Sequence, residues 1–88
     1  MDEYAQLRAL LDLVESVDIE IRRAPAELID GGGAHPGGAL VTLRGREILF
    51  LDPDAAVAER IEVAAAALRD RPGLEDVFIP PQIRQLID

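Results

Sequence analysis

The residues best spaced for chemistry are glycines. Gly32 and Gly37 have the spacing that opens a phosphate-binding loop, but that loop continues with Lys and then Ser or Thr, where this chain has Gly38 and Ala39. The segment that follows is predicted to be a strand, whereas phosphate binding of this kind depends on the N-terminus of a helix. We therefore expect no nucleotide site here, and we interpret Gly31–Gly38 as a loop.

A second pattern is the pair Asp52 and Asp54, which has the spacing of the first and third ligands of a calcium-binding loop. Such a loop needs Gly at its sixth position and Glu at its twelfth, and this chain has Val57 and Val63 there. Asp52 followed by Pro53 is typical of a helix start, with Asp52 as N-cap and Pro53 in the first turn. The pattern therefore predicts a helix and no metal site.

The other reactive side chains are few. His35 is the one histidine, Ser16 and Thr42 are the one serine and the one threonine, and there is no cysteine. A zinc site built on several His or Cys ligands cannot form within one such chain, and no base is predicted beside either hydroxyl. We therefore expect no catalytic residue, metal or cofactor, and a protein that is not an enzyme.

The basic residues are all arginines, and Arg22, Arg23, Arg44 and Arg46 lie near the predicted strands. If the first strand pairs antiparallel with the hairpin, Arg22 and Arg23 lie at the opposite end from Arg44 and Arg46. These arginines would then form two small patches and no groove. Together with His35 they are the candidate contacts for a ligand or partner, and solubility of the strand ends is the alternative reading.

Composition limits the remaining classes. The 88 residues are enough for one domain, residues 1–88. The net charge of −8 opposes binding to nucleic acid, and no apolar run approaches the ~20 residues that cross a membrane. The acidic start does not resemble a signal peptide, and a chain without cysteine suits a reducing compartment. We expect a soluble protein of the cytoplasm.

The apolar pattern predicts two flanking elements before the hairpin. Leucines and valines at helical spacing predict a helix over Glu3–Ser16, with Asp2 as N-cap, and the breadth of this stripe indicates more than one neighbour. Alternation over Val17–Arg22 predicts a half-exposed strand at or beside an edge of the sheet. A short helical turn is predicted at Ala26–Asp30.

The hairpin is the predicted centre of the fold. Its arms are Ala39–Leu43 and Glu47–Leu51, and Gly45 supplies the positive φ of the turn. Ile48–Leu51 has no polar residue on either face, so both sides need cover and the strand should be central. A helix to about Arg69 and a last helical segment from Pro80 follow. We predict an α+β fold: helix, strand, β-hairpin, long helix and short C-terminal helix, with a three-stranded, mainly antiparallel sheet and helices on one face.

Gly37-Gly38-Ala39-Leu40, Leu51-Asp52 and Ile79-Pro80-Pro81-Gln82-Ile83-Arg84 resemble segments of small uncharacterised bacterial α+β proteins. Over residues 38–68 the chain also resembles the core of the ImmA/IrrE-like zinc metallopeptidases. In those enzymes the helix after the strand pair carries His-Glu-x-x-His, and this chain has Ala64-Ala65-Ala66-Ala67-Leu68 at the comparable stretch. The resemblance therefore implies a scaffold without peptidase activity.

Three functions remain after this reading. The favoured one is a non-enzymatic interaction or structural protein that forms a homodimer, in which a second copy covers the apolar strand. The second is a small-ligand or substrate site under the Gly31–Gly38 loop, with His35 and Arg22 or Arg23 as its polar groups. The third is an acidic regulator that binds a basic protein.

Overall fold

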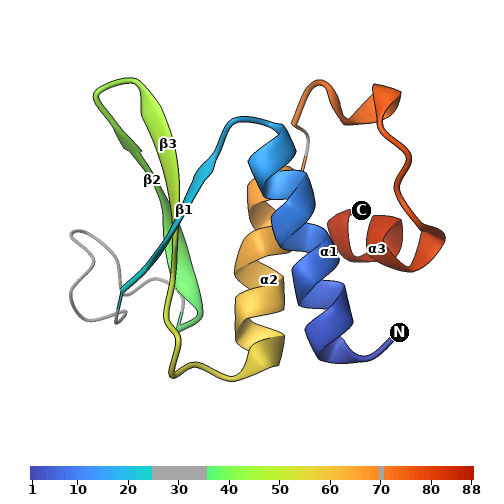
Figure 1. Cartoon of the computed structure of the whole chain (residues 1–88), viewed down its shortest axis with the longest axis horizontal. Helices are drawn as coiled ribbons and strands as arrows, with labels where there is room; N and C mark the ends of the chain where they lie inside the picture. The colour runs from blue at the N-terminus through green and yellow to red at the C-terminus, as the bar shows by residue number, and fades with distance from the viewer. Residues whose placement is uncertain (25–35, 70) are drawn as a thin grey trace.

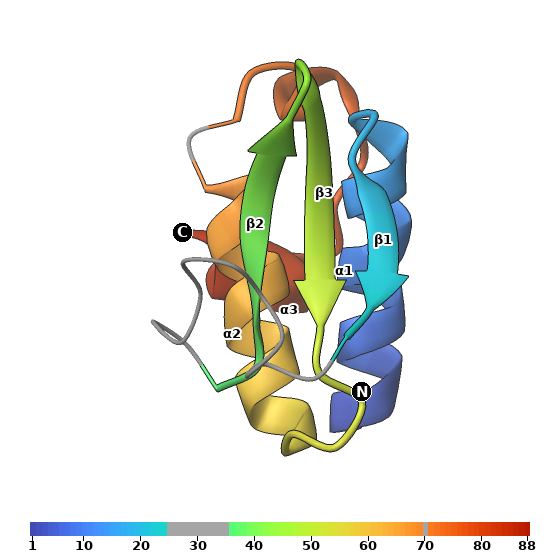
Figure 2. The same ribbon diagram turned by 90° about the vertical axis from the view of Figure 1, so that its left-hand side faces the viewer.

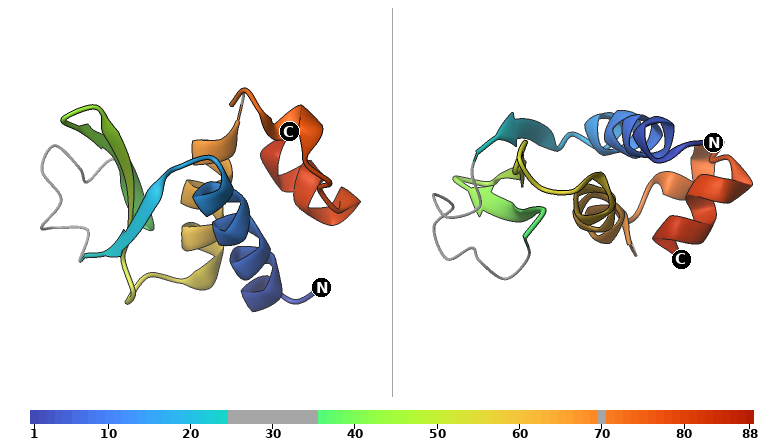
Figure 3. Two further views of the ribbon diagram at one scale, coloured as in Figure 1. Left: turned by 45° about the horizontal axis from the view of Figure 1, so that its top comes forward. Right: turned by 90° about the horizontal axis from the view of Figure 1, so that it is seen from below.

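Three α-helices and a three-stranded sheet form the described part of the protein, a computed structural model that describes residues 1–24, 36–69 and 71–88 (Figure 1). The sheet forms one layer, α1 and α2 pack against it, and α3 lies on the side of these helices away from the sheet (Figures 1 and 3). The predicted α+β class is confirmed. The elements are α1 (Glu3–Ser16), β1 (Glu20–Arg23), β2 (Gly38–Leu43), β3 (Arg46–Leu51), α2 (Val57–Leu68), a 3₁₀ turn (Leu74–Asp76) and α3 (Pro81–Ile87).

The sheet has the order β1-β3-β2, so the apolar strand β3 is central, as predicted (Figure 2). β2 pairs antiparallel with β3 over six residue pairs, and β1 pairs parallel with β3 over four. Leu49 has Ile21 on one side and Leu40 on the other. The prediction that β1 lies at an edge is also confirmed.

The turn between β2 and β3 consists of two residues with positive φ, Arg44 at 53° and Gly45 at 79°. Positive φ at both central positions defines a type I′ turn, whose twist matches that of a hairpin. Gly45 adopts positive φ without steric cost because it has no Cβ. Arg44 has a Cβ and adopts positive φ at a steric cost, because both central residues of this two-residue turn have positive φ. The predicted arms of the hairpin put Arg46 in the turn, but Arg46 is the first residue of β3.

Helix α1 has the predicted bounds and the predicted cap, since the carboxylate of Asp2 accepts a hydrogen bond from the Ala5 amide at 2.8 Å. Its buried residues are Leu7, Leu10, Leu13 and Val14. These side chains meet several neighbours, because α1 contacts α2, β1 and α3. The broad apolar stripe is explained by these three contacts.

The predicted start of α2 is wrong by four residues. Asp52 accepts a hydrogen bond from the Asp54 amide on its side chain and one from the Ala55 amide on its carbonyl. These bonds close a separate turn, and the helix begins at Val57 with Ala56 as an N-cap that has no side-chain hydrogen bond. An Asp-Pro pair predicts both structures equally, because the same side-chain bond forms an Asx turn or a helix cap.

The core lies between the sheet and the helices. Leu49 and Leu51 of β3 contribute to it from the sheet, Leu10 from α1 and Leu68 from α2. The last helix is held by Ile83 and Ile87, both buried. The last carbonyl groups of a helix have no partner within the helix. In α3 the guanidinium of Arg69 donates to two of them, the carbonyl oxygens of Leu86 and Ile87.

Two glycines let the chain enter β2 in a narrow space. A Cβ on Gly37 would lie 2.3 Å from the Glu59 carbonyl oxygen of α2, and a Cβ on Gly38 would lie 1.9 Å from the Phe50 carbonyl oxygen of β3. Gly38 also has a φ of 144°, which side chains rarely tolerate. These glycines fix the position of β2 between β3 and α2.

Candidate functional site

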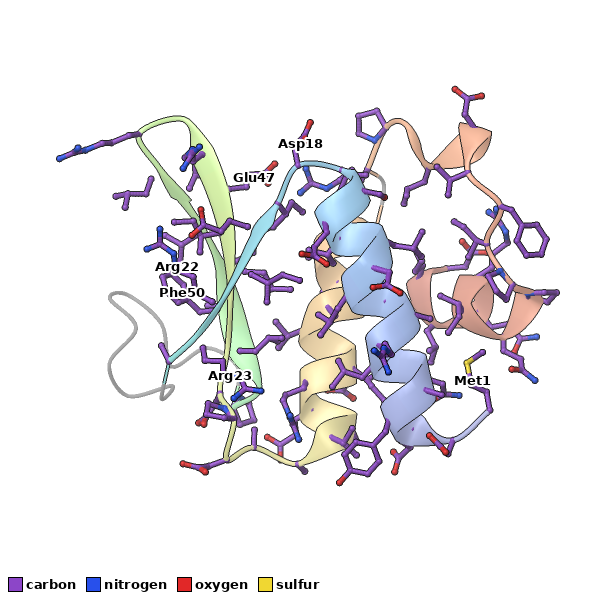
Figure 4. All side chains as sticks on the ribbon, in the orientation of Figure 1. Met1, Asp18, Arg22, Arg23, Glu47 and Phe50 are labelled. Atoms are coloured by element: carbon purple, nitrogen blue, oxygen red, sulfur yellow. The ribbon has the colours of Figure 1, made fainter. Side chains whose placement is uncertain are left out.

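The predicted contact residues do not form one site. Glu20 pairs with the guanidinium of Arg22 and with that of Arg46, the second at 3.6 Å. These side chains lie on the outer face of the sheet, away from the helices, where Figure 4 shows Arg22 beside Phe50. Much of the positive charge of this pair is therefore neutralised by Glu20, and the pairs are exposed and weak.

The other predicted cations lie at opposite ends of the sheet. Arg44 is at the hairpin tip, and Arg23 is at the end of β1 beside Leu51, because β1 runs parallel to β3 and away from that tip. Parallel pairing was not expected, and it places Arg23 near the start of α2. His35, the helical turn at Ala26–Asp30 and the ligand site under the Gly31–Gly38 loop fall on residues outside the described ranges.

The edge formed by β2 is open and uncharged. β3 covers one side of β2, and no described strand covers the other. The six residues Gly38–Leu43 contain no charge and no proline, whereas β1, at the opposite edge, carries Glu20, Arg22 and Arg23. Charge and proline are common protections of an edge strand, so β1 carries such protection and the residues of β2 do not.

The side chains along β2 are unusually exposed for apolar groups. Leu43 keeps 54% of its surface and Leu40 keeps 38%. Leu40 shares a face with Leu49 on the helix side, and Leu43 shares the outer face with Val41. Both faces of β2 therefore present apolar surface beside an edge that no described strand covers.

The outer face of β3 needs less cover than the sequence indicated. Ile48, which points away from the helices, is only 2% exposed within a single chain, and Phe50 beside it is half-buried. A second copy is therefore not required to cover Ile48, which was the original reason to expect one. The apolar surface that remains for a partner lies along β2.

Among the described residues, a bidentate ion pair joins β3 to the segment after α2. Arg71 donates to both carboxylate oxygens of Glu47, at 2.6 and 2.7 Å, and its Nε donates to the Ala67 carbonyl at 3.0 Å. The hydrogen bonds from Arg71 lower the pKa of Glu47 and, in turn, raise the pKa of Arg71, and burial opposes both effects. These three hydrogen bonds make Arg71 a structural clamp that holds the end of α2 against β3.

Three arginines that sequence reasoning did not group line one open hollow of about 520 Å³. Arg8 comes from α1, Arg23 from the end of β1 and Arg60 from the first turn of α2. The Nε of Arg60 is shielded from solvent and has no hydrogen-bond partner among the described residues. Positions 8, 23 and 60 are too far apart in sequence for any motif to connect them.

The rest of this hollow is lined by Tyr4 and by apolar and acidic side chains. Leu7, Leu11 and Ile21 line its apolar part, and Asp12 and Glu15 follow Arg8 along α1. A second hollow, of about 240 Å³, lies between the end of α2 and α3, where Leu68, Leu74, Ile79 and Ile87 meet Arg71, Arg84 and Asp88.

The remaining reactive groups have structural surroundings. Ser16 donates to the Leu13 carbonyl at 2.6 Å at the end of α1, and Thr42 is exposed on β2. Within residues 1–24, 36–69 and 71–88, no group of three or more His, Cys, Asp or Glu side chains could hold a metal ion. Over the same residues, no helix has the length and hydropathy needed to cross a membrane.

Comparison of the chain with protein-family models, with curated proteins and with solved structures finds no match.

Proposed function

We propose that the protein is a non-enzymatic interaction protein that acts as a homodimer, in which the β2 strands of two copies pair edge to edge. The observation that carries this proposal is the unprotected edge of β2, an uncharged strand of six residues with exposed leucines. Edge pairing would provide hydrogen-bond partners for the backbone N–H and C=O groups on the side of β2 that no described strand covers. It would also join two three-stranded sheets into one of twice the size.

A second copy of the chain fits this edge for reasons of symmetry and charge. In a two-fold dimer the same strand supplies both sides of the contact, and closed two-fold dimers are the commonest oligomers. The chain carries a net charge of −8, which opposes contact between most of its surface and another copy. β2 has no charged residue, so pairing along it places no like charges against each other.

We further propose that the protein works in the cytoplasm. A chain without cysteine needs no oxidising compartment, and its acidic surface favours solubility. For a domain of this size the dimer interface would add appreciably to a modest stability.

Sedimentation equilibrium over a range of concentrations tests the proposal. We expect the wild-type chain to reach twice the monomer mass, and the double variant Thr42→Lys/Leu43→Lys to remain monomeric because it gives the edge strand of each copy two charges, which oppose pairing of the strand with another chain. Both positions are exposed, so the variant should fold. The matched control, Phe78→Lys/Gln82→Lys, makes the same charge change at exposed positions outside the sheet and should leave the dimer intact. A wild-type monomer, or equal loss of dimer in both variants, would overturn the proposal.

A further inference from the structure

The open hollow lined by Arg8, Arg23 and Arg60 combines three guanidinium groups with a shielded donor that has no acceptor, two features of an anion-binding site. Its volume of about 520 Å³ is in the range of small-molecule sites. We propose that it binds a phosphate monoester of metabolite size, with the phosphate held by the three guanidinium groups.

The topology brings the three cations to one end of the hollow. After α1, the chain turns at Asp18 and returns as β1, so Arg23 lies level with the first half of α1, which carries Arg8. α1 and α2 begin at the same end of the molecule, and Arg60 is in the first turn of α2 (Figure 1). Figure 4 shows Arg23 at this end of the sheet. The positive end of the α2 dipole adds to the field there.

No ion pair among the described residues holds any of the three arginines. The Nε of Arg60 is buried and unpaired, and a buried donor without an acceptor is costly. An oxyanion between the guanidinium groups would supply the missing acceptors, because a guanidinium binds such an anion through two parallel hydrogen bonds.

Charge selects phosphate over a single carboxylate. The three guanidinium groups outnumber the two carboxylates of the lining, those of Asp12 and Glu15, and at their end of the hollow they favour an anion with more than one negative charge. A phosphate monoester carries about −1.5 to −2 at neutral pH. Asp12 and Glu15 line the hollow one and two turns further along α1. They would repel a second anionic group and accept hydrogen bonds from hydroxyl or amine groups, while Leu7, Leu11 and Ile21 pack against the carbon skeleton.

The proposal is independent of the dimer, because the hollow lies on the β1 side of the molecule and the seam would lie along β2. The two can therefore fail separately.

Isothermal titration of the full chain with glucose 6-phosphate, inorganic phosphate and glucose tests the site. We expect glucose 6-phosphate to bind more tightly than inorganic phosphate, and glucose not to bind. Arg23→Gln and Arg60→Gln should each weaken binding of glucose 6-phosphate about tenfold or more, the usual loss for one charge-assisted contact. Arg44→Gln, at the hairpin tip, makes the same charge change outside the hollow and should leave the affinity unchanged.

Amide chemical shifts recorded during the same titration locate the ligand, even if Arg60→Gln unfolds. We expect shifts in α1, at the end of β1 and in the first turn of α2. Failure of both phosphates to bind, equal affinity for phosphate and glucose 6-phosphate, an equal loss in Arg44→Gln, or shifts confined to other elements would each overturn the proposal.

Discussion

Arg71 and Glu47 form a two-point clamp between the end of α2 and the sheet, with N–O distances of 2.6 and 2.7 Å. Arg71 also holds the last turn of α2 through the Ala67 carbonyl. The two side chains are only partly exposed, and their geometry is bidentate. Unlike the Arg22 and Arg46 contacts with Glu20, this pair should therefore contribute measurably to stability.

Glu47→Gln should lower the free energy of unfolding by about 1 kcal/mol at neutral pH. The pKa of Glu47 is lowered in the folded protein from an ordinary value of 4.5, so its contribution is fully present above that pH. It is lost as the pH falls through the lowered pKa, since the carboxylate is then protonated in both states. Arg71 stays charged throughout. Urea unfolding at neutral pH and at about pH 2 measures this difference.

The control for this prediction is Glu20→Gln, which removes an exposed partner of two arginines. It should change stability by less than about 0.5 kcal/mol. An equal loss in Glu47→Gln at both pH values would contradict the assignment of the effect to the carboxylate charge.

Gly38→Ala should destabilise the fold by about 2–4 kcal/mol or prevent folding, because its Cβ would lie 1.9 Å from the Phe50 carbonyl oxygen. Gly45→Ala is the matched comparison, since Gly45 also has positive φ but nothing lies within 4 Å of its Cβ position. We expect Gly45→Ala to cost only about 1 kcal/mol. Thermal unfolding of both variants checks the ranking, and a reversed order would show that the entry into β2 is less crowded than described.

Ala56→Ser should stabilise the protein by about 1 kcal/mol, because Ala56 is the N-cap of α2 and provides no side-chain acceptor. The backbone there is already extended, with φ −59° and ψ 145°. Asp2→Ala provides the converse, since it removes a cap that is present on α1. If Ala56→Ser had no effect or destabilised the protein in chemical denaturation, α2 would begin elsewhere.

The parts of the fold that local sequence signals determine were predictable. The cap at Asp2 and the spacing of the leucines gave the bounds of α1, and the absence of polar residues in Ile48–Leu51 gave the central place of β3. The alternation over Val17–Arg22 fixed which side chains of β1 face the core, but alternation is the same in parallel and antiparallel pairs. The direction of β1 was therefore not predictable from it.

Sequence reasoning missed the arginine hollow for a related reason. The position of Arg23 beside the start of α2 depends on the parallel pairing of β1, and without that pairing Arg8 and Arg60 have no evident relation to it. The burial of Ile48 was also underestimated, because it is only 2% exposed within a single chain. The hollow arises from tertiary contacts between segments distant in sequence.

Edge pairing of β2 is the central claim, and intermolecular nuclear Overhauser effects in a mixture of isotope-labelled and unlabelled chains test it most directly. The account predicts effects between Gly38–Leu43 of one copy and the same residues of its partner, in an antiparallel pattern. Such effects found only at other surfaces, or no intermolecular effects at any concentration where the protein stays in solution, would contradict it.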